Sequence, residues 1–365
     1  MRQFIEGKTI LVTGGTGSIG SEIVRQLLTY DPKMVRVLSR SEHMQYQLIQ
    51  ELGRLPNLVC FIGDVRDPER LNRASVEADV IFHVAAMKHV PLCEFNAFEA
   101  IESNVIGAQN VINAAITNKV KQVIAISTDK AVNPMNVMGA TKLLAEKLFT
   151  SAHHYAGVSG TKFACVRFGN VLGSRGSVVP AWIDQIVKGK PVTITDPDMT
   201  RFFLSIPQAV SLVFKAMTRM VGGEIFILKM PVLRMGDLVE AVIQHFSPNQ
   251  GIDPTAVERK IVGVRPGEKM YELLMTEDES SIALEVDEMF IIPPHIEIPH
   301  RGLKRRTYEG AQPAPTAGYD SRRDLPLGRR SILQMLQEVF PERIRRPSPI
   351  VRPSRRSLIE RTFPS

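Results

Sequence analysis

The sequence predicts an α/β fold: a doubly wound parallel sheet followed by a smaller second domain. Short runs rich in β-branched residues recur about one helix apart through the first 170 residues. A glycine-rich loop directly follows the first of these runs and opens a helical pattern. Strands that alternate with helices are joined by right-handed crossovers, which make the strands parallel and place helices on both faces of the sheet.

The expected elements follow one another in that alternating order. The first strand covers residues 8–13, the loop covers 14–20, and the first helix covers 21–28. The later strands are short and apolar, as expected of strands that helices cover on both faces. They are expected at 35–38, 58–61, 79–83 and 122–126, with further helices at 43–52 and 137–148.

The composition and the hydrophobic pattern of the sequence change after residue 170. Residues 171–200 are rich in Gly, Pro and Ser, and residues 202–221 return to a helical pattern. Residues 226–228 are expected to add a strand to the sheet, and residues 231–294 to alternate short helices with Gly and Pro breaks. The predicted division is a first domain of residues 1–170 with about 201–228, and a second, substrate-binding domain of residues 171–200 and 229–300.

The C-terminal end carries the basic character of the chain. Residues 301–365 hold 15 Lys and Arg against 6 Asp and Glu, so the net charge of +7 leaves −2 for residues 1–300. Within 301–340 we expect a linker at 305–318 and an amphipathic helix at 331–340, and we expect residues 341–365 to be a disordered tail. A contact with a polyanion or a membrane surface is the alternative for this tail, but the nearly neutral remainder indicates no nucleic-acid partner.

Composition indicates a cytoplasmic globular protein. Apolar residues make up 44% of the chain and charged residues 23%, which is ordinary for such proteins. No run approaches the length of about 18 apolar residues that a membrane span needs, and the start lacks a signal-peptide pattern. Cys60, Cys93 and Cys165 are scattered, and His153 and His154 have no third ligand in pattern, so we expect neither disulfides nor a metal site.

The glycine loop is typical of a dinucleotide-binding site. It satisfies the G-x-G-x-x-G pattern between a strand and a helix, where glycines allow a tight turn and let backbone N–H groups approach a pyrophosphate. A purely structural glycine turn is the alternative. The loop residues expected at the cofactor are Gly14, Thr16, Gly17, Ser18, Ile19 and Gly20.

The end of the second strand bears on the choice between NAD and NADP. An acidic residue there would bind the ribose 2′-hydroxyl, but this chain has Ser39, Arg40 and Ser41. A cation flanked by hydroxyls suits a 2′-phosphate, so we expect NADP rather than NAD; alternatively, Arg40 only stacks on the adenine. At the next strand ends, Asp64 and Val65 are expected near the adenine, and Ala85 and Ala86 near the ribose.

Two acid–base residues follow the strand at 122–126. Asp129 and Lys130 are expected at the carboxyl end of that strand, the edge of an open α/β sheet where ligands bind. A carboxylic acid could donate a proton to a leaving hydroxyl, and a Lys with a pKa lowered by burial and nearby positive charge could remove a carbon-bound proton. The alternative is an ordinary ion pair. On the next helix Met138 and Lys142 share one face, where Lys142 could hold the ribose hydroxyls of a nicotinamide cofactor.

These residues carry a resemblance. The chain resembles the extended short-chain dehydrogenase/reductases that act on nucleotide sugars, and it is most similar to the UDP-N-acetylglucosamine 4,6-dehydratases of bacterial polysaccharide and glycan synthesis. The resemblance implies that Thr128, Asp129 and Lys130 are catalytic. Many members have a Tyr at the position of Met138, but a subset has Met, which implies an active enzyme. Between residue 10 and about 292 the matching blocks are TGGTGSIG, LSRSE, GDVRD, AAMKHVPLCE, STDKAVNPMNVMGATK, RFGNVLGSRGSVVP, ITDPDMTRFF and VRPGEKMYELL.

The resemblance implies a redox-neutral reaction and a homo-oligomeric enzyme. Hydride would leave sugar C4, Lys130 would remove the acidified C5 proton, Asp129 would protonate the departing C6 hydroxyl, and hydride would return to C6. The product would be a UDP-4-keto-6-deoxy-N-acetylhexosamine, with C5 either retained or inverted. Thr128, a water or Lys142 would assist loss of the C4 hydroxyl proton.

The substrate side requires groups that bind a nucleoside diphosphate. Arg175, Arg201 and Arg265 are suited to phosphate or ribose contacts, with surface cations as the alternative. The resemblance adds substrate positions at Lys88, Asn170, Ser177, Val178, Thr195 and Glu268, and a cofactor position at Val171.

Two other functions compete with this prediction. A UDP-hexose 4-epimerase would share the cofactor fold but would be expected to keep the Tyr and would not need Asp129 and Lys130. A nucleotide-binding protein with an inactivated site would bind NADP tightly and turn over no UDP-hexose.

Overall fold

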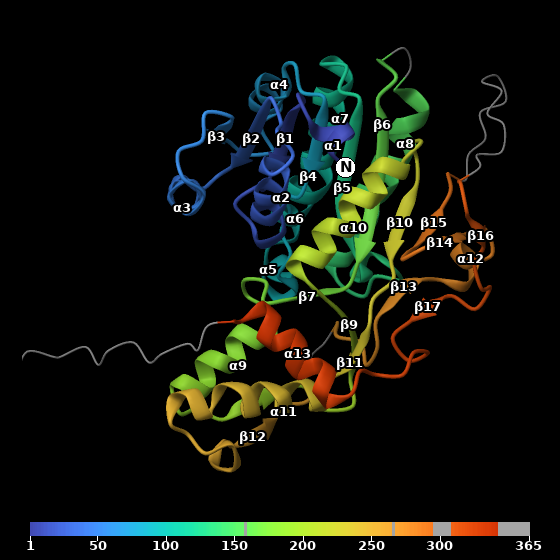
Figure 1. Ribbon diagram of the computed structural model, residues 1–365. Helices are drawn as coiled ribbons and strands as arrows, with labels where there is room; N and C mark the ends of the chain where they lie inside the picture. Colours follow the sequence, from blue (N-terminus) through green and yellow to red (C-terminus); the bar gives the residue numbers. More distant parts are fainter. Residues whose placement is uncertain (157–158, 265–266, 295–307, 342–365) are drawn as a thin grey trace, which may run out of the picture.

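The computed structural model describes residues 1–156, 159–264, 267–294 and 308–341, and it confirms the predicted doubly wound α/β architecture (Figure 1). Ten strands form the main sheet in the order β16-β14-β15-β10-β6-β5-β4-β1-β2-β3. The seven strands from β3 to β10 are paired in parallel, and β15, β14 and β16 continue the sheet with antiparallel pairing. The strands are β1 (Thr9–Thr13), β2 (Met34–Ser39), β3 (Leu58–Ile62), β4 (Val80–His83), β5 (Gln122–Thr128), β6 (Lys162–Phe168), β10 (Ile225–Leu228), β14 (Leu284–Val286), β15 (Met289–Ile292) and β16 (Gln312–Pro313).

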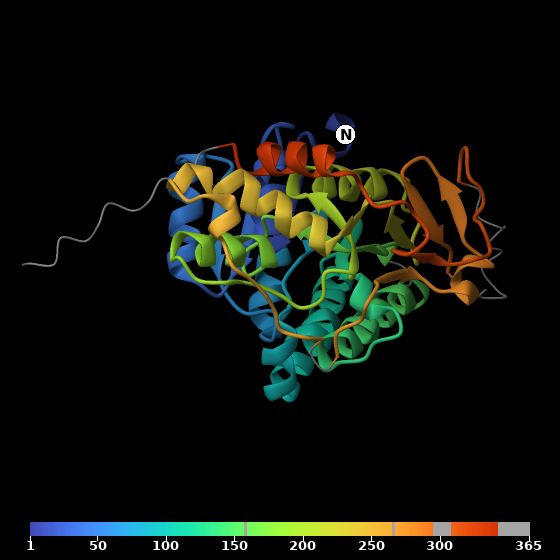
Figure 2. The ribbon, with the colours of Figure 1, turned by 90° about the horizontal axis from the view of Figure 1, so that it is seen from below.

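Helices cover both faces of this sheet. Helix α2 packs on α10, and α7 packs on both α4 and α8. Figure 2 shows the α10 side and the α7–α8 side on opposite faces. Every residue of β1 is buried, as expected of a strand covered on both faces. The helices of this part are α1 (Arg2–Ile5), α2 (Ser18–Leu28), α3 (Glu42–Leu52), α4 (Pro68–Ser75), α5 (Val90–Phe95), α6 (Ala97–Ile101), η1 (Glu102–Ile106), α7 (Gly107–Thr117), η2 (Asp129–Ala131), α8 (Val137–Tyr155) and α10 (Ile206–Arg219).

A second apolar core lies beyond the carboxyl ends of the strands. Trp182, Phe246, Ile332 and Leu336 are buried together there, between three helices that form a separate lobe in Figure 1. The helices of this lobe are α9 (Val178–Val187), α11 (Met235–Phe246) and α13 (Arg329–Val339), with the 3-10 turns η4 (Pro248–Gln250) and η5 (Pro254–Ala256) and the paired strands β8 (Val192–Ile194) and β12 (Arg259–Ile261). Between the lobe and the sheet run β7 (Asn170–Leu172), β9 (Thr200–Ser205) and β11 (Val232–Arg234), while β13 (Leu273–Met275), α12 (Glu277–Ser280) and β17 (Tyr319–Asp320) complete the fold.

The prediction for residues 202–221 was wrong at its beginning. Residues up to Ser205 belong to β9, which pairs with both β7 and β11. The helix begins only at Ile206, because Ser205 and Gln208 form a capping box. The Ser205 side chain accepts from the Gln208 N–H, and the Gln208 side chain accepts from the Ser205 N–H. Pro207 occupies the first turn, where a missing N–H is tolerated. The helix α9 was not predicted, since residues 171–200 were identified only by their Gly, Pro and Ser content.

Residues 231–294 and 305–318 also differ from their predictions. The first segment contains one long helix, α11, and several strands rather than a series of short helices. Its strands β14 and β15 extend the main sheet, although residues 229–300 were assigned to the second domain. The expected linker is packed where it is described: Gln312–Pro313 pairs with β14, and Tyr308 and Ala314 are buried. Of the expected tail, residues 342–365 lie outside the described residues.

Candidate functional site

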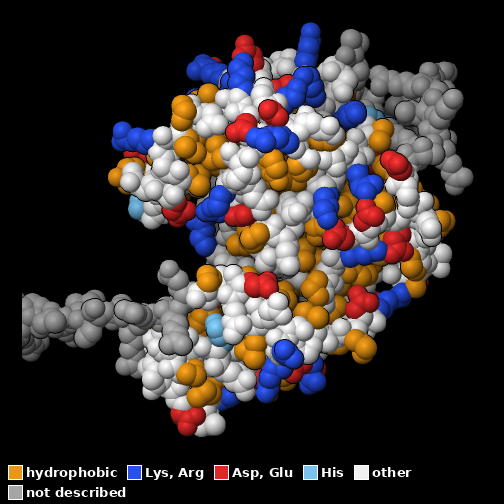
Figure 3. All heavy atoms as spheres, in the orientation of Figure 1, with side chains coloured by type: hydrophobic (Ala, Val, Ile, Leu, Met, Phe, Trp, Pro, Cys, Tyr) orange, Lys and Arg blue, Asp and Glu red, His pale blue; other side chains and the backbone are white. Residues whose placement is uncertain are grey.

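A cavity of about 840 Å³ lies at the carboxyl ends of the parallel strands. The glycine loop, the ends of β2, β4 and β5, the start of α8 and the segment after β6 all contribute to its wall. Figure 3 shows the surface indented between the sheet and the lobe of α9, α11 and α13. This is the sheet edge at which the sequence predicts the site.

The glycine loop fits a pyrophosphate. Gly14 has a positive φ of 67°, and a Cβ on it would lie 2.7 Å from the Ala85 nitrogen. A Cβ on Gly20 would lie 2.3 Å from the Gly14 carbonyl oxygen, so the turn closes tightly on the helix. Gly17 precedes α2 with no side-chain cap, which leaves the first N–H groups of that helix available to an anion. Gly14, Thr16, Gly17, Ser18 and Ile19 line the cavity, whereas Gly20 packs behind them.

The other expected cofactor residues also line the cavity: Ser39, Arg40, Ser41, Asp64, Val65, Ala85, Ala86, Lys142 and Val171. The Arg40 side chain is 65% exposed, and its Nη1 is 3.8 Å from an Asp64 carboxylate oxygen. Asp64 is bound more closely by Arg66, whose Nε and Nη2 donate to it at 3.1 and 2.9 Å. Arg40 is therefore free to turn toward an anion at the rim.

Three polar atoms of the wall lack partners among the described residues. The Ser127 hydroxyl, the Asn170 side-chain nitrogen and the Ser177 hydroxyl are buried and make no hydrogen bond there. All three residues line the cavity. Buried polar groups are normally hydrogen-bonded, so their arrangement indicates a ligand rich in polar groups. Ser127 was not predicted, although it precedes Thr128 in a block already recognised.

Thr128, Asp129 and Lys130, called the triplet below, form one hydrogen-bonded unit at the end of β5. The Thr128 hydroxyl donates to Asp129 Oδ1 at 2.6 Å, and Lys130 Nζ donates to the two carboxylate oxygens at 3.1 and 3.2 Å. Asp129 is buried beneath the surface, while Thr128 and Lys130 line the cavity. The start of α8 packs closely here, since a Cβ on Gly139 would lie 2.2 Å from the Lys130 carbonyl oxygen.

Lys130 could act as a base if its pKa were lowered, and the groups around it shift that pKa in two opposite directions. Burial lowers its pKa, but the negative charges of Asp129 and Glu272 outweigh burial and hold the pKa above its ordinary value. Burial likewise raises the pKa of Asp129, but the charge of Lys130 and several hydrogen bonds outweigh it and hold that pKa low. Within the described residues, Asp129 and Glu272 therefore favour the ammonium form of Lys130, and Lys130 favours the carboxylate form of Asp129.

Glu272 is a site residue that the sequence did not indicate. Its Oε1 lies 3.6 Å from Lys130 Nζ and 3.2 Å from Arg201 Nε. Burial, together with the charge of Asp129, raises the pKa of Glu272 to about 7. It lies in the recognised block VRPGEKMYELL, from which only Arg265 and Glu268 were selected.

Met138 and Lys142 lie on the cavity face of α8, as their spacing predicts. Lys142 is buried, its Nζ donates to the Ile126 carbonyl at 2.6 Å, and burial lowers its pKa. Met138 packs against Cys93 and Ala100. The Asn136 side chain starts this helix by accepting from the Gly139 N–H at 2.8 Å, which fixes the direction of both side chains.

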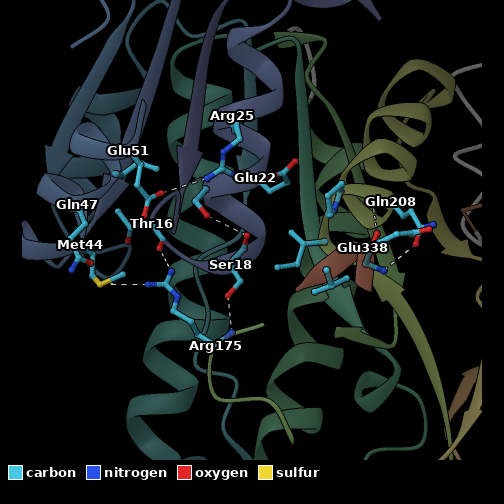
Figure 4. Close-up of a pocket in the computed structure, with 16 residues that line it drawn as sticks. Thr16, Ser18, Glu22, Arg25, Met44, Gln47, Glu51, Arg175, Gln208 and Glu338 are labelled. Carbon is cyan, nitrogen blue, oxygen red and sulfur yellow. Dashed lines mark hydrogen bonds and ion pairs between the residues drawn. The ribbon is translucent and has the colours of Figure 1, made fainter. Parts of the chain in front are cut away.

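Arg175 and Lys88 line the cavity on the side of the glycine loop. Lys88 Nζ donates to the Arg175 carbonyl at 2.7 Å, and the Arg175 N–H donates to the Ser18 hydroxyl at 3.0 Å. The guanidinium binds the Thr16 carbonyl and points toward Met44, at the edge of a neighbouring cavity of about 710 Å³ (Figure 4). Both the backbone and the guanidinium of Arg175 thus contact the glycine loop.

The remaining substrate candidates take different positions. Asn170 and Ser177 line the cavity, and Val178 begins α9 directly after Ser177. Thr195, Arg201 and Glu268 do not line it, and Arg265 lies outside the described residues. Arg201 donates to the carbonyls of Thr200, Lys269 and Met270, and it forms an ion pair with Glu272, so its guanidinium is occupied by the protein.

Neither a metal site nor a membrane-spanning helix is found among the described residues. No three His, Cys, Asp or Glu side chains there are placed to hold a metal ion. Within the same residues, no helix combines the length and apolar character needed to cross a bilayer.

The fold and the strand–glycine loop–helix site define an extended short-chain dehydrogenase/reductase. The family model described as polysaccharide biosynthesis protein matches residues 10–294. The chain therefore belongs to the polysaccharide biosynthesis protein family, which confirms the resemblance drawn from its motifs.

Three proteins similar to this chain carry different names. An uncharacterized membrane protein of Methanocaldococcus jannaschii is 57% identical over 80% of this chain and 87% of its own length. A UDP-N-acetylglucosamine 4,6-dehydratase (inverting) of Campylobacter jejuni is 45% identical over 79% of this chain and 84% of its own. A UDP-glucose 4-epimerase of Rickettsia massiliae is 41% identical over 78% and 83%.

Solved structures agree with the fold. The X-ray structure of Pen from Bacillus thuringiensis is 44% identical, covers 92% of this chain and 98% of its own, and superimposes with a TM-score of 0.84. The dTDP-glucose 4,6-dehydratase DesIV from Streptomyces venezuelae, solved with NAD and TYD bound, is 24% identical over 72% of this chain and 86% of its own, with a TM-score of 0.64.

Proposed function

We propose that the protein is an NADP-dependent UDP-N-acetylglucosamine 4,6-dehydratase that forms a UDP-4-keto-6-deoxy-N-acetylhexosamine. The observation that carries the proposal is the hydrogen-bonded triplet at the same cavity as the glycine loop. Alcohol oxidation alone does not need an adjacent acid and amine, whereas elimination of water needs both a proton donor and a proton acceptor. The relatives named as dehydratases support the same reaction.

The cofactor would occupy the part of the cavity lined by the glycine loop and by the residues after β2 and β3, and the sugar nucleotide the part lined by Asn170 and Ser177. The glycine loop would hold the pyrophosphate, and Arg40 with Ser39 and Ser41 the 2′-phosphate. A bound nicotinamide would supply hydride removal at C4 and hydride return at C6. Ser127, Asn170 and Ser177, with their unpartnered polar atoms, would bind hydroxyl, amide or phosphate groups of the ligands.

The triplet would carry the proton transfers. Lys130 lines the cavity and would remove the C5 proton, and Asp129 would deliver a proton to the leaving C6 hydroxyl. At rest Lys130 is held as an ammonium and Asp129 as a carboxylate, so a proton would pass along their hydrogen bond from Lys130 to Asp129 before the elimination. Lys142, whose pKa is lowered, and the Thr128 hydroxyl are the groups that would assist loss of the C4 hydroxyl proton.

The test is incubation with UDP-N-acetylglucosamine in D₂O, followed by NMR of the product. We expect a 4-keto-6-deoxy sugar with deuterium at C5, because the C5 proton exchanges with solvent while it is held by Lys130. Asp129→Asn and Lys130→Ala are expected to keep NADP affinity within about threefold and to lower dehydration at least 100-fold, since a positioned acid or base contributes about 10²–10⁴. Normal turnover in either variant contradicts the assignment.

A UDP-hexose 4-epimerase is the second candidate, favoured by the relatives that bear that name. An epimerase changes only the configuration at C4 and leaves the C6 hydroxyl in place. Retention of the C6 hydroxyl in the same NMR spectra, with inversion at C4, identifies this activity. Tight NADP binding without turnover of any UDP-hexose identifies a protein that only binds the nucleotide.

A further inference from the structure

Residues 267–272, called the strap below, lie against the turn that joins the triplet to helix α8. The Lys269 side chain of the strap is half-buried, and its Nζ donates to the carbonyls of Val132 and Asn133 at 2.9 and 2.8 Å. An ammonium has three donors, so one side chain can bind both carbonyls. Lys269 thereby joins the turn to a segment that is distant from it in the sequence.

The turn itself has a constrained backbone. Asn133 has a positive φ of 45°, which is uncommon outside Gly, although Asn adopts it more easily than most residues. Val132 ends η2, and its N–H donates to the Asp129 carbonyl at 3.0 Å. A backbone of this kind persists where its surroundings hold it. A shift of the turn would therefore move Asp129 and Lys130 with it.

The strap is anchored to the sheet that carries part of the cavity wall. Arg201 on β9 donates to the carbonyls of Lys269 and Met270 at 2.7 and 3.2 Å. The Thr200 N–H donates to the same Met270 carbonyl at 3.0 Å. Strand β9 pairs with β7, whose Asn170 lines the cavity. The strap thus connects this wall to the turn that follows the triplet.

A second side chain of the strap contacts the triplet. Glu272 Oε1 lies 3.6 Å from Lys130 Nζ, and the Glu272 N–H donates to the Ser321 hydroxyl at 3.0 Å. The strap therefore contacts the triplet through Glu272 and the turn after it through Lys269. Neither of these two side chains lines the cavity. Their contacts bear on the position of the triplet and not on contact with a substrate.

We propose that Lys269 is a positioning residue for the triplet, and this rests on the dehydratase function proposed above. By binding two successive carbonyls of the turn, its ammonium fixes the place of Asp129 and Lys130 relative to the sugar. Proton transfer requires a separation of about 2.6–3.2 Å between the heavy atoms, and a misplacement of about 1 Å can cost about 100-fold in rate. Loss of the ammonium therefore slows the chemical step and leaves the affinity for the substrate intact.

The test measures kcat and KM for dehydration of UDP-N-acetylglucosamine, together with NADP⁺ affinity, in Lys269→Met. Methionine is also unbranched but donates no hydrogen bond, so both carbonyls of the turn lose their partner. We expect kcat to fall about tenfold or more, with KM and NADP⁺ affinity within about threefold of the unchanged protein. Lys269→Arg keeps the charge and several donors and is expected to restore part of kcat.

Lys260→Met is the matched control, because it makes the same substitution at an exposed position of β12. It is expected to leave kcat and KM unchanged. An unchanged kcat in Lys269→Met overturns the inference, and so does an Arg variant that is no more active than the Met variant. A loss confined to KM also overturns it, because Lys269 would then be a substrate contact.

Folding of the variants is checked by circular dichroism. If Lys269→Met does not fold, Lys269→Gln, which shortens the side chain and removes its charge, is compared with Lys269→Arg under the same criteria. The proposed function fails separately, in the unchanged protein. Absence of dehydration there refutes that function and with it the inference, whereas failure of the inference alone is seen only in the variants.

Discussion

At the residue scale, Asp129 and Lys130 could be located from the sequence, but their charge states could not. Their place at the end of a strand follows from the apolar run before them. The pKa values depend on Glu272, which reaches them only because β13 pairs with β17. No local pattern indicates that pairing. Arg175 shows the same limit, since its residue type suits a phosphate but its fold position directs it to the Thr16 carbonyl.

A residue-scale prediction concerns the choice of cofactor. Arg40→Ala is expected to weaken NADP⁺ binding by about tenfold to 100-fold, because a charge-assisted contact contributes about 1.5–3 kcal/mol, while NAD⁺ affinity stays within about threefold. Titration calorimetry with both nucleotides measures this difference. Arg73→Ala, an exposed Arg paired only with Glu69 among the described residues, is the control. Equal losses for both nucleotides would assign Arg40 to the adenine.

At the scale of the element, the parallel strands were predictable and the boundary between β9 and α10 was not. Phe202, Phe203 and Leu204 are apolar enough to continue a helix or a strand. Pairing with β7 and β11 decides for the strand, and the cap at Ser205 then begins the helix.

The cap gives an element-scale prediction. Ser205→Ala is expected to lower the free energy of unfolding by about 1 kcal/mol, because it removes the acceptor of the Gln208 N–H. Thr218→Ala, in the last turn of the same helix, removes only a hydroxyl bond to the Lys215 carbonyl and is expected to change stability by less than about 0.5 kcal/mol. Urea unfolding followed by circular dichroism compares the two variants. Equal effects would show that the cap is not a boundary signal.

At the scale of the whole molecule, one buried Arg joins three parts of the fold. Arg167 on β6 donates to Glu146 on α8, to Glu279 on α12 and to the Leu274 carbonyl of β13. Its side chain is 1% exposed. The helix that carries Lys142 and the strand next to Glu272 are thereby held to the same strand of the sheet.

Arg167→Met is expected to destabilise the protein by about 3–5 kcal/mol, because it leaves Glu146 buried without its cation. Arg234→Met breaks only an exposed pair with Asp198 and is expected to cost less than about 1 kcal/mol. The shift of the urea midpoint measures both losses. Similar midpoints for the two variants would mean that the buried pair is not a major support.

The return of residues 312–321 to the body of the protein has a consequence for synthesis. The glycine loop and the first parallel strands leave the ribosome early, and chains begin to fold from the N-terminus as they emerge. The carboxyl of Glu272 comes late, and its backbone partner Ser321 later still. The nascent chain therefore contains the whole glycine loop well before it contains Glu272 and the residue that holds the Glu272 backbone.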